Sequence, residues 1–281
     1  MRPSRSLGIF LLAVGAACSS ATLPAATETN PTVENPTETK DSGTSSATDA
    51  GPTTPPTDAG ADTAAPADDI LGTLSGSCGI VKTLLASPSP SLEENVLAFV
   101  PGETYGKASL SADGQRMFDT ANAGGSSTES EVMSLEVLRH CEGATLLKTE
   151  TEIGYAPPDD SGPNTITDIL VEIGGSKVGV SVTRAYKPPT QTLSDADVKS
   201  LLEKKLEGIV RSSQRVLPGD KWVKQILHVF SVNQAATDAI GRVLPTIDAA
   251  IRADTIVLVT QTTGGGFIYC NPDPPLGSEC L

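Results

Sequence analysis

The chain has 281 residues and a formal net charge of −14, and so acidic a protein is a poor general binder of nucleic acid. Its only histidines are His140 and His228, which excludes a histidine-rich metal site. The charge is uneven, however, because residues 177–224 hold ten Lys or Arg against five Asp or Glu. This imbalance indicates that one face of the fold is basic.

The first residues have the pattern of an export signal. Arg2 and Arg5 precede an apolar run at 7–17, which is too short to span a bilayer, and small residues then lead to Cys18. This arrangement resembles a bacterial lipoprotein signal, except that Gly15 stands where such signals carry an aliphatic residue. The resemblance implies that residues 1–17 are removed and that a lipid on Cys18 anchors the protein in the bacterial cell envelope. The alternative is ordinary signal cleavage, which would give a soluble secreted protein.

Residues 18–69 differ in composition from the rest of the chain. They are mostly Thr, Pro, Ala, Ser and acidic residues, and they contain no aromatic side chain. Such a segment buries too little apolar surface to offset its ordering entropy, so we expect a disordered linker between membrane and domain. A glycosylated stalk or a cell-wall-binding tail is the alternative. Residues 70–281 then have the length of one globular domain.

Four cysteines follow Cys18, at Cys78, Cys141, Cys270 and Cys280. An even number in an exported protein favours disulfides over metal or redox roles. A local bridge between Cys270 and Cys280 would close the Pro- and Gly-rich end of the chain and leave Cys78 to pair with Cys141. The sequence alone does not choose among the three connectivities.

Hydrophobic periodicity gives the order of elements from about residue 128, whereas residues 70–125 are ambiguous. Gly174, Gly175 and Ser176 separate two strands and indicate a hairpin. The predicted elements are a helix at 130–142, strands at 144–155, 167–173 and 177–185, a helix at 194–213, a strand at 222–232, a helix at 235–252, a strand at 255–262 and a further short strand at 267–270. This order predicts an α/β fold with a mixed central sheet flanked by helices.

Two charged residues interrupt apolar helix stripes. Lys205 falls within the stripe of the helix at 194–213, and Glu136 falls within that of the helix at 130–142. Burial of an unpaired charge is costly, so each residue needs a partner or a role. The alternatives are that Lys205 extends its amine to solvent and that Glu136 pairs with His140, one turn away.

The hairpin carries further polar residues. Ser181 and Thr183 share one face of its second strand, opposite a row of valines. Asp168 begins its first strand, where the alternative is that it caps the preceding loop. We expect Glu136, Asp168, Ser181, Thr183 and Lys205 to line one polar pocket.

The order of helix, three-stranded meander, helix and strand resembles the PD-(D/E)xK, or restriction-endonuclease-like, nucleases. The resemblance implies that Glu136 and Asp168 are carboxylates that hold Mg²⁺, which activates water for attack on a phosphodiester. The third strand departs from the family, because Ser181-Val182-Thr183 replaces its acidic-x-Lys triplet. The segment SVTRA also resembles uncharacterised proteins, several of them eukaryotic, that share this hairpin and the following Lys-rich helix.

Nearby residues offer replacements for the missing groups. Lys205 would supply the amine, Glu150 or Glu152 the carboxylate, and Arg184 further positive charge, although by alternation Arg184 points with the valines. The sequence therefore leaves two hypotheses. The first is a weak Mg²⁺-dependent phosphodiesterase that acts outside the cytoplasm on nucleic acid or another phosphodiester. The second is a non-catalytic binding or structural lipoprotein that kept the fold and lost the active site.

Overall fold

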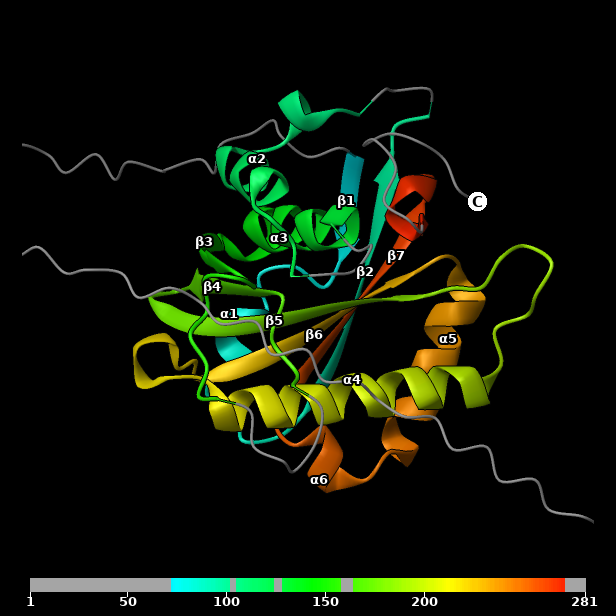
Figure 1. The fold of residues 1–281 in the computed structure, drawn as a ribbon. Coiled ribbons are helices and arrows are strands. Elements are labelled where there is room, and N and C mark those ends of the chain that lie inside the picture. Colours follow the sequence, from blue (N-terminus) through cyan, green and yellow to red (C-terminus); the bar gives the residue numbers. More distant parts are fainter. Residues whose placement is uncertain (1–71, 102–104, 124–127, 158–163, 271–281) are drawn as a thin grey trace, which may run out of the picture. The chain divides into compact units, whose positions relative to one another are not determined.

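The computed structural model describes residues 72–101, 105–123, 128–157 and 164–270. Their strands form one seven-stranded sheet in the order β1-β2-β7-β6-β5-β4-β3 (Figure 1). The strands β2, β7, β6 and β5 run parallel to one another, whereas β1 pairs antiparallel with β2, and β4 pairs antiparallel with both β5 and β3. The expected mixed α/β sheet is thus confirmed. The predicted signal at 1–17, the linker at 18–69 and Cys18 lie outside the described residues.

The strands occupy short, mostly buried segments. In chain order they are β1 (Gly72–Gly76), β2 (Ser91–Phe99), β3 (Thr145–Thr149), β4 (Ile169–Ile173), β5 (Ser176–Ala185), β6 (Lys224–Ser231) and β7 (Ile256–Thr263). Every residue of β6 is buried, as expected for a central parallel strand covered on both faces.

Helices cover both faces of the sheet (Figure 1). The α-helices are α1 (Val81–Leu84), α2 (Ala112–Asp119), α3 (Thr128–Glu142), α4 (Asp195–Arg215), α5 (Gln234–Val243) and α6 (Ala249–Arg252), and the 3₁₀ turns are η1 (Lys107–Ser109), η2 (Pro218–Asp220), η3 (Leu244–Thr246) and η4 (Gly266–Tyr269). The α3 and η4 segments pack with the valines of β5 in one core, and α4 and α5 pack on the opposite face in a second core. These two apolar layers hold the sheet between them.

The predicted core of helix, meander, helix and strand is present as α3, β3-β4-β5, α4 and β6. Gly174 and Gly175 form the hairpin turn with φ of 57° and 79°, a left-handed conformation that glycine adopts without strain. The α4 helix begins with a capping box between Ser194 and Asp197. The glycine turn that predicted the hairpin is therefore present in the folded chain.

Three predicted elements differ from those in the structure. The strand expected at 144–155 ends at Thr149, because the Glu152 side chain accepts a hydrogen bond from the Thr149 amide and closes a turn. The helix expected at 235–252 breaks at η3, where Pro245 lacks an amide donor. The strand expected at 267–270 is instead the 3₁₀ turn η4, which packs into the core beside α3.

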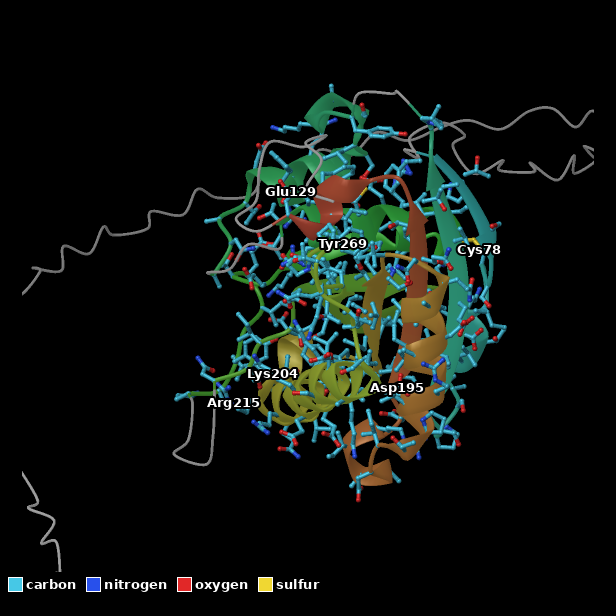
Figure 2. The ribbon with its side chains drawn as sticks, turned by 90° about the vertical axis from the view of Figure 1, so that its right-hand side faces the viewer. Cys78, Glu129, Asp195, Lys204, Arg215 and Tyr269 are labelled. Carbon is cyan, nitrogen blue, oxygen red and sulfur yellow. A yellow bond between two sulfur atoms is a disulfide. The ribbon has the colours of Figure 1, made fainter. Side chains whose placement is uncertain are left out.

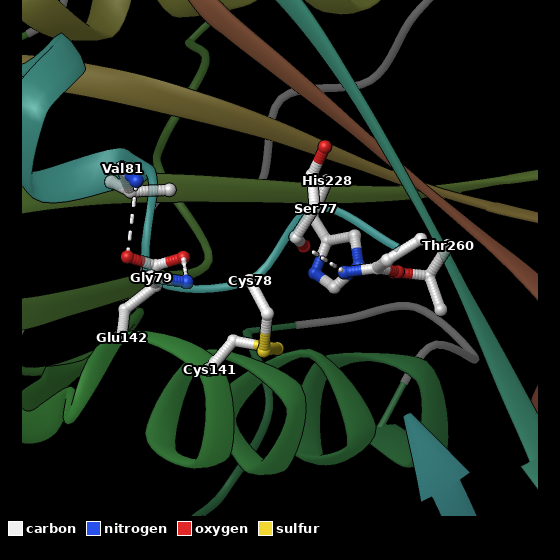
Figure 3. Close-up of a disulfide and its surroundings, with 9 residues drawn as sticks. Ser77, Cys78, Gly79, Val81, Cys141, Glu142, His228 and Thr260 are labelled. Atoms are coloured by element: carbon white, nitrogen blue, oxygen red, sulfur yellow. Dashed lines mark hydrogen bonds between the residues drawn. A yellow bond between two sulfur atoms is a disulfide. The ribbon is translucent and has the colours of Figure 1, made fainter. Parts of the chain in front are cut away.

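A disulfide joins the loop after β1 to the end of α3 (Figure 3). It links Cys78 to Cys141, as expected. Beside it, the Glu142 carboxylate accepts hydrogen bonds from the Gly79 amide at 2.9 Å and the Val81 amide at 3.0 Å. These contacts fix the start of the domain to α3.

The second expected disulfide is only partly visible. Cys270 is disulfide-bonded. Cys280 lies outside the described residues, so its pairing with Cys270 stays a prediction. Over the described ranges, no helix is long and apolar enough to cross a membrane.

Candidate functional site

The candidate site is built around the backbone of Val182, in the middle of β5. Asp168 Oδ2 accepts a hydrogen bond from the Val182 amide at 2.5 Å, and Lys205 Nζ donates one to the Val182 carbonyl oxygen at 2.8 Å. Asp168 comes from the residue before β4, and Lys205 comes from the middle of α4. We call this arrangement of Asp168, Val182 and Lys205 the Val182 clasp.

The electrostatics of the clasp extend to Glu150, just after β3. Burial raises the pKa of the Asp168 carboxyl, and the Lys205 charge and the Val182 hydrogen bond oppose that rise. Burial likewise raises the pKa of Glu150, and Asp168 adds to the rise while the Ala123 amide and Lys205 oppose it. The positive charge of Lys205 therefore acts on the two neighbouring carboxyl groups of Asp168 and Glu150.

Glu150 occupies the place expected of a replacement carboxylate, whereas Glu152 does not. Glu150 lines a cavity together with Asp168. The Glu152 carboxylate instead forms an ion pair with Arg116 at 2.7 Å and accepts a hydrogen bond from the Thr149 amide. Of the two glutamates proposed from the sequence, Glu150 is the one beside Asp168.

The cavity that Glu150 shares with Asp168 is very small. Its volume is about 10 Å³, roughly the space of one water molecule. Glu131, from the first turn of α3, is the third carboxylate that lines it. The helix glutamate at this position is therefore Glu131, and the sequence had pointed to Glu136 instead.

Glu136 has a different contact. Its Oε1 accepts hydrogen bonds from the Ser111 amide at 2.9 Å and the Ser111 hydroxyl at 2.7 Å, both in the core. Ser111 is the N-cap of α2, where a negative charge is favourable. Glu136 does not line the cavity of Asp168 and Glu150, and His140, its alternative partner, is exposed. The structure thus separates Glu136 from the clasp.

Ser181 and Thr183 flank the clasp on β5. Both are buried, with 6% and 8% of their surface exposed, on the strand face that alternates with the valines. Ser181 lines a groove along α4 with Lys205, while Thr183 is not among the residues that line it. Of the five predicted site residues, the structure therefore joins Asp168, Ser181 and Lys205 around Val182, with Thr183 next along the strand.

Arg184 follows the alternation expected for it. It lies with the valines, and its Nη1 donates hydrogen bonds to the Ile268 carbonyl at 3.3 Å and the Cys270 carbonyl at 2.6 Å. These bonds hold η4 against the sheet, on the face opposite α4. Arg184 therefore contacts the C-terminal turn rather than the clasp.

Several oxygen atoms near the clasp that Mg²⁺ could bind are already engaged by the protein itself. This ion requires a near-octahedral shell of oxygen ligands, but Asp168 Oδ2 and Glu150 Oε1 already accept hydrogen bonds from the amides of Val182 and Ala123. The Val182 carbonyl oxygen is bound by Lys205. Within the part of the chain that the structure describes, no three His, Cys, Asp or Glu side chains are grouped to hold a metal ion.

Two buried polar groups were not predicted from the sequence. His228 lies fully buried on β6, where its ring nitrogens are hydrogen-bonded to Ser134 on α3 and Thr260 on β7. Figure 3 shows His228 beside Thr260. Lys224, at the start of β6, is buried and donates to three backbone carbonyl groups. Their partners lie far from them in the sequence, so no local pattern reveals these contacts.

Comparisons with known proteins show what the chain is similar to. No protein-family model matches the chain. The AAC-rich mRNA clone AAC4 protein of Dictyostelium discoideum is 41% identical over 170 residues, which is 57% of this chain and 24% of that protein. This chain therefore spans only about a quarter of the length of that relative.

One solved structure also matches. The structure of Pyrococcus furiosus SfsA in complex with Ca²⁺ is 14% identical and covers 48% of this chain and 56% of that chain, with a TM-score of 0.26. Because the TM-score is this low, the fold is described only from the chain's own order of strands and helices.

Proposed function

We propose that this protein is exported, is anchored to a membrane by a lipid on Cys18, and carries a restriction-endonuclease-like domain that binds a ligand without cutting it. The export signal and linker in the sequence support the first two points. The Val182 clasp supports the third, because both Asp168 and Lys205 are engaged by the backbone of β5.

The clasp gives the two residues a structural role. In a nuclease the amine assists a water molecule and the carboxylate holds a metal ion. Here the Lys205 ammonium group is bound to a carbonyl oxygen, and its charge opposes the rise that burial causes in the pKa of Asp168. It supplies the positive charge that a bound cation would otherwise bring to the two carboxyl groups. The domain then needs no divalent cation to offset the negative charge of these carboxyl groups.

The test is hydrolysis of a phosphodiester by the purified full chain. Plasmid DNA and an aryl phosphodiester are incubated with Mg²⁺, with Mn²⁺, or with EDTA. We expect no hydrolysis above the EDTA blank. An Asp168→Asn variant is the matched control, because any activity that it retains comes from a contaminating nuclease. Metal-dependent cleavage that this variant loses would contradict a non-catalytic domain.

The second candidate is a weak Mg²⁺-dependent phosphodiesterase. The observation in its favour is that Glu131, Glu150 and Asp168 line one cavity. Carboxylates that share a site are common among metal-dependent hydrolases. This function requires Asp168 to be released from the Val182 amide. The same hydrolysis assay decides between the two candidates.

A further inference from the structure

A groove runs along α4, on the opposite face of the sheet from the core that contains Tyr269. Figure 2 labels Lys204 of α4 and Tyr269. Its volume is about 500 Å³, within the range of small-molecule sites. We call it the α4 groove, and the side chains that line it are Thr165, Ser181, Lys204, Lys205, Glu207 and Arg211. It lies on one side of the Val182 clasp, and the small carboxylate cavity adjoins the clasp through Asp168.

The groove is basic in an acidic protein. Lys204, Lys205 and Arg211 line it against the single carboxylate of Glu207, which forms an ion pair with Arg211 at 2.6 Å. Lys205 is fixed by the Val182 carbonyl group. Lys204 is exposed, and among the described residues its ammonium group has no hydrogen-bond or ion-pair partner. Positive charge therefore remains available at the mouth of the groove.

Apart from Glu207, the wall of the groove offers hydrogen-bond donors and open space. Ser181 places a buried hydroxyl group where the nuclease triplet would place a carboxylate. Gly208 faces the groove without a side chain, and an added Cβ there would meet only Thr165, at 3.6 Å. A carboxylate at position 181 would repel a phosphate unless a metal ion lay between them, whereas a hydroxyl group can donate to it directly.

We propose that the α4 groove binds the phosphoryl or pyrophosphoryl group of a small molecule. Ammonium and guanidinium groups with nearby hydroxyl donors suit a multiply charged oxyanion and need no bridging metal ion. The proposal rests on the non-catalytic function above and names the class of ligand that the domain takes. The bound phosphate contacts Lys204 first, with Lys205 and Ser181 deeper in the groove.

The experiment is a calorimetric titration of the full chain with inorganic pyrophosphate in the presence of EDTA. We expect saturable binding to one site. Lys204→Glu should weaken it by about tenfold or more, as loss of one charge-assisted contact implies. The matched control is Lys199→Glu, which makes the same charge change on α4 at an exposed residue outside the groove and should alter affinity by less than about twofold.

A variant that fills the groove without changing its charge tests whether binding requires the open space. Gly208→Met raises the helix propensity and fills the groove, so it should also weaken pyrophosphate binding by about tenfold. Absence of saturable binding by the wild-type protein would overturn the proposal. Equal losses in Lys204→Glu and Lys199→Glu would also overturn it, since they would indicate attraction by overall charge alone.

The titration can fail independently of the proposed function. If pyrophosphate does not bind and no phosphodiester is hydrolysed, the domain remains non-catalytic and the ligand class is wrong. If Mg²⁺-dependent hydrolysis appears and Asp168→Asn removes it, the non-catalytic function is wrong, whatever the titration gives.

Discussion

Ser134 on α3 and His228 on β6 are joined by a 2.7 Å hydrogen bond in the core, where neither side chain is exposed to solvent. The direction of this bond follows from the next two. Thr260 donates its hydroxyl proton to Asn95 Oδ1, so it must accept from His228 Nε2. His228 Nδ1 then carries no proton and accepts from the Ser134 hydroxyl. The core therefore holds His228 as one neutral tautomer.

This arrangement predicts that stability falls in acid. Burial lowers the pKa of His228 to about 3, whereas the unfolded chain binds this proton near pH 6.5. Because the folded pKa is depressed, the unfolded state holds the extra proton between about pH 6.5 and 3. His228 should thus reduce the free energy of unfolding by about 1.4 kcal/mol for each pH unit in that window. Urea unfolding at several pH values measures the slope.

The chain has one other histidine, which serves as the matched control. His140 is exposed at the end of α3, so His140→Gln should retain the acid-dependent loss of stability. His228→Gln should reduce it, at the cost of a less stable core. The prediction fails if His140→Gln, rather than His228→Gln, flattens the pH dependence.

Lys224 should contribute to stability through its ammonium group. Its Nζ donates to the carbonyl oxygens of Leu84 at 3.1 Å, Ser87 at 2.6 Å and Ser89 at 3.2 Å, so it fixes the loop between α1 and β2. Lys224→Met keeps the length of the side chain but leaves these carbonyl groups without a donor. We expect a loss of roughly 2–4 kcal/mol in the free energy of unfolding, measured with urea.

Lys221 provides the comparison for Lys224. It lies three residues earlier and is exposed, although its ammonium group also donates to a carbonyl group, that of Ser213. Lys221→Met should change stability by no more than about 0.5 kcal/mol. Equal losses in the two variants would show that burial of the Lys224 bonds is unimportant.

The proposed anchor can be tested by fractionation. Cys18→Ala removes the thiol that would carry the lipid, and the polar linker at 18–69 has no membrane affinity of its own. The variant should appear in the soluble fraction, whereas the wild-type protein should stay in the membrane fraction after a high-salt wash. A variant that sediments with membranes as the wild type does would rule out the lipid anchor.

The sequence predicted the central part of the fold because its local signals are strong there. The alternation in β5 and the glycine turn before it each act within a few residues. Asp168 and Lys205 were found for a related reason. Lys205 interrupts an apolar stripe, and the helix that carries it must pack on the hairpin that Asp168 begins.

The misplaced glutamate shows where local patterns stop being informative. Glu131 and Glu136 both lie buried on α3, but only Glu131 lines the cavity that also holds Asp168. The Ser111 cap of α2 takes Glu136, and α2 lies in a region without a clear pattern in the sequence. In the same way, nothing near His228 indicates that its partner is Ser134, 94 residues away.

The central claim is that Asp168 and Lys205 jointly hold the backbone of β5 at Val182. A double-mutant cycle tests it through the free energies of unfolding of Asp168→Ala, Lys205→Met and the double variant, with Lys204→Met as the exposed neighbour. We predict a loss on the order of 1–3 kcal/mol for each clasp variant and at most about 0.5 kcal/mol for Lys204→Met. The double variant should lose less than the sum of the single losses by at least about 0.5 kcal/mol. A Lys205→Met variant as stable as Lys204→Met, with losses that simply add, would contradict the account.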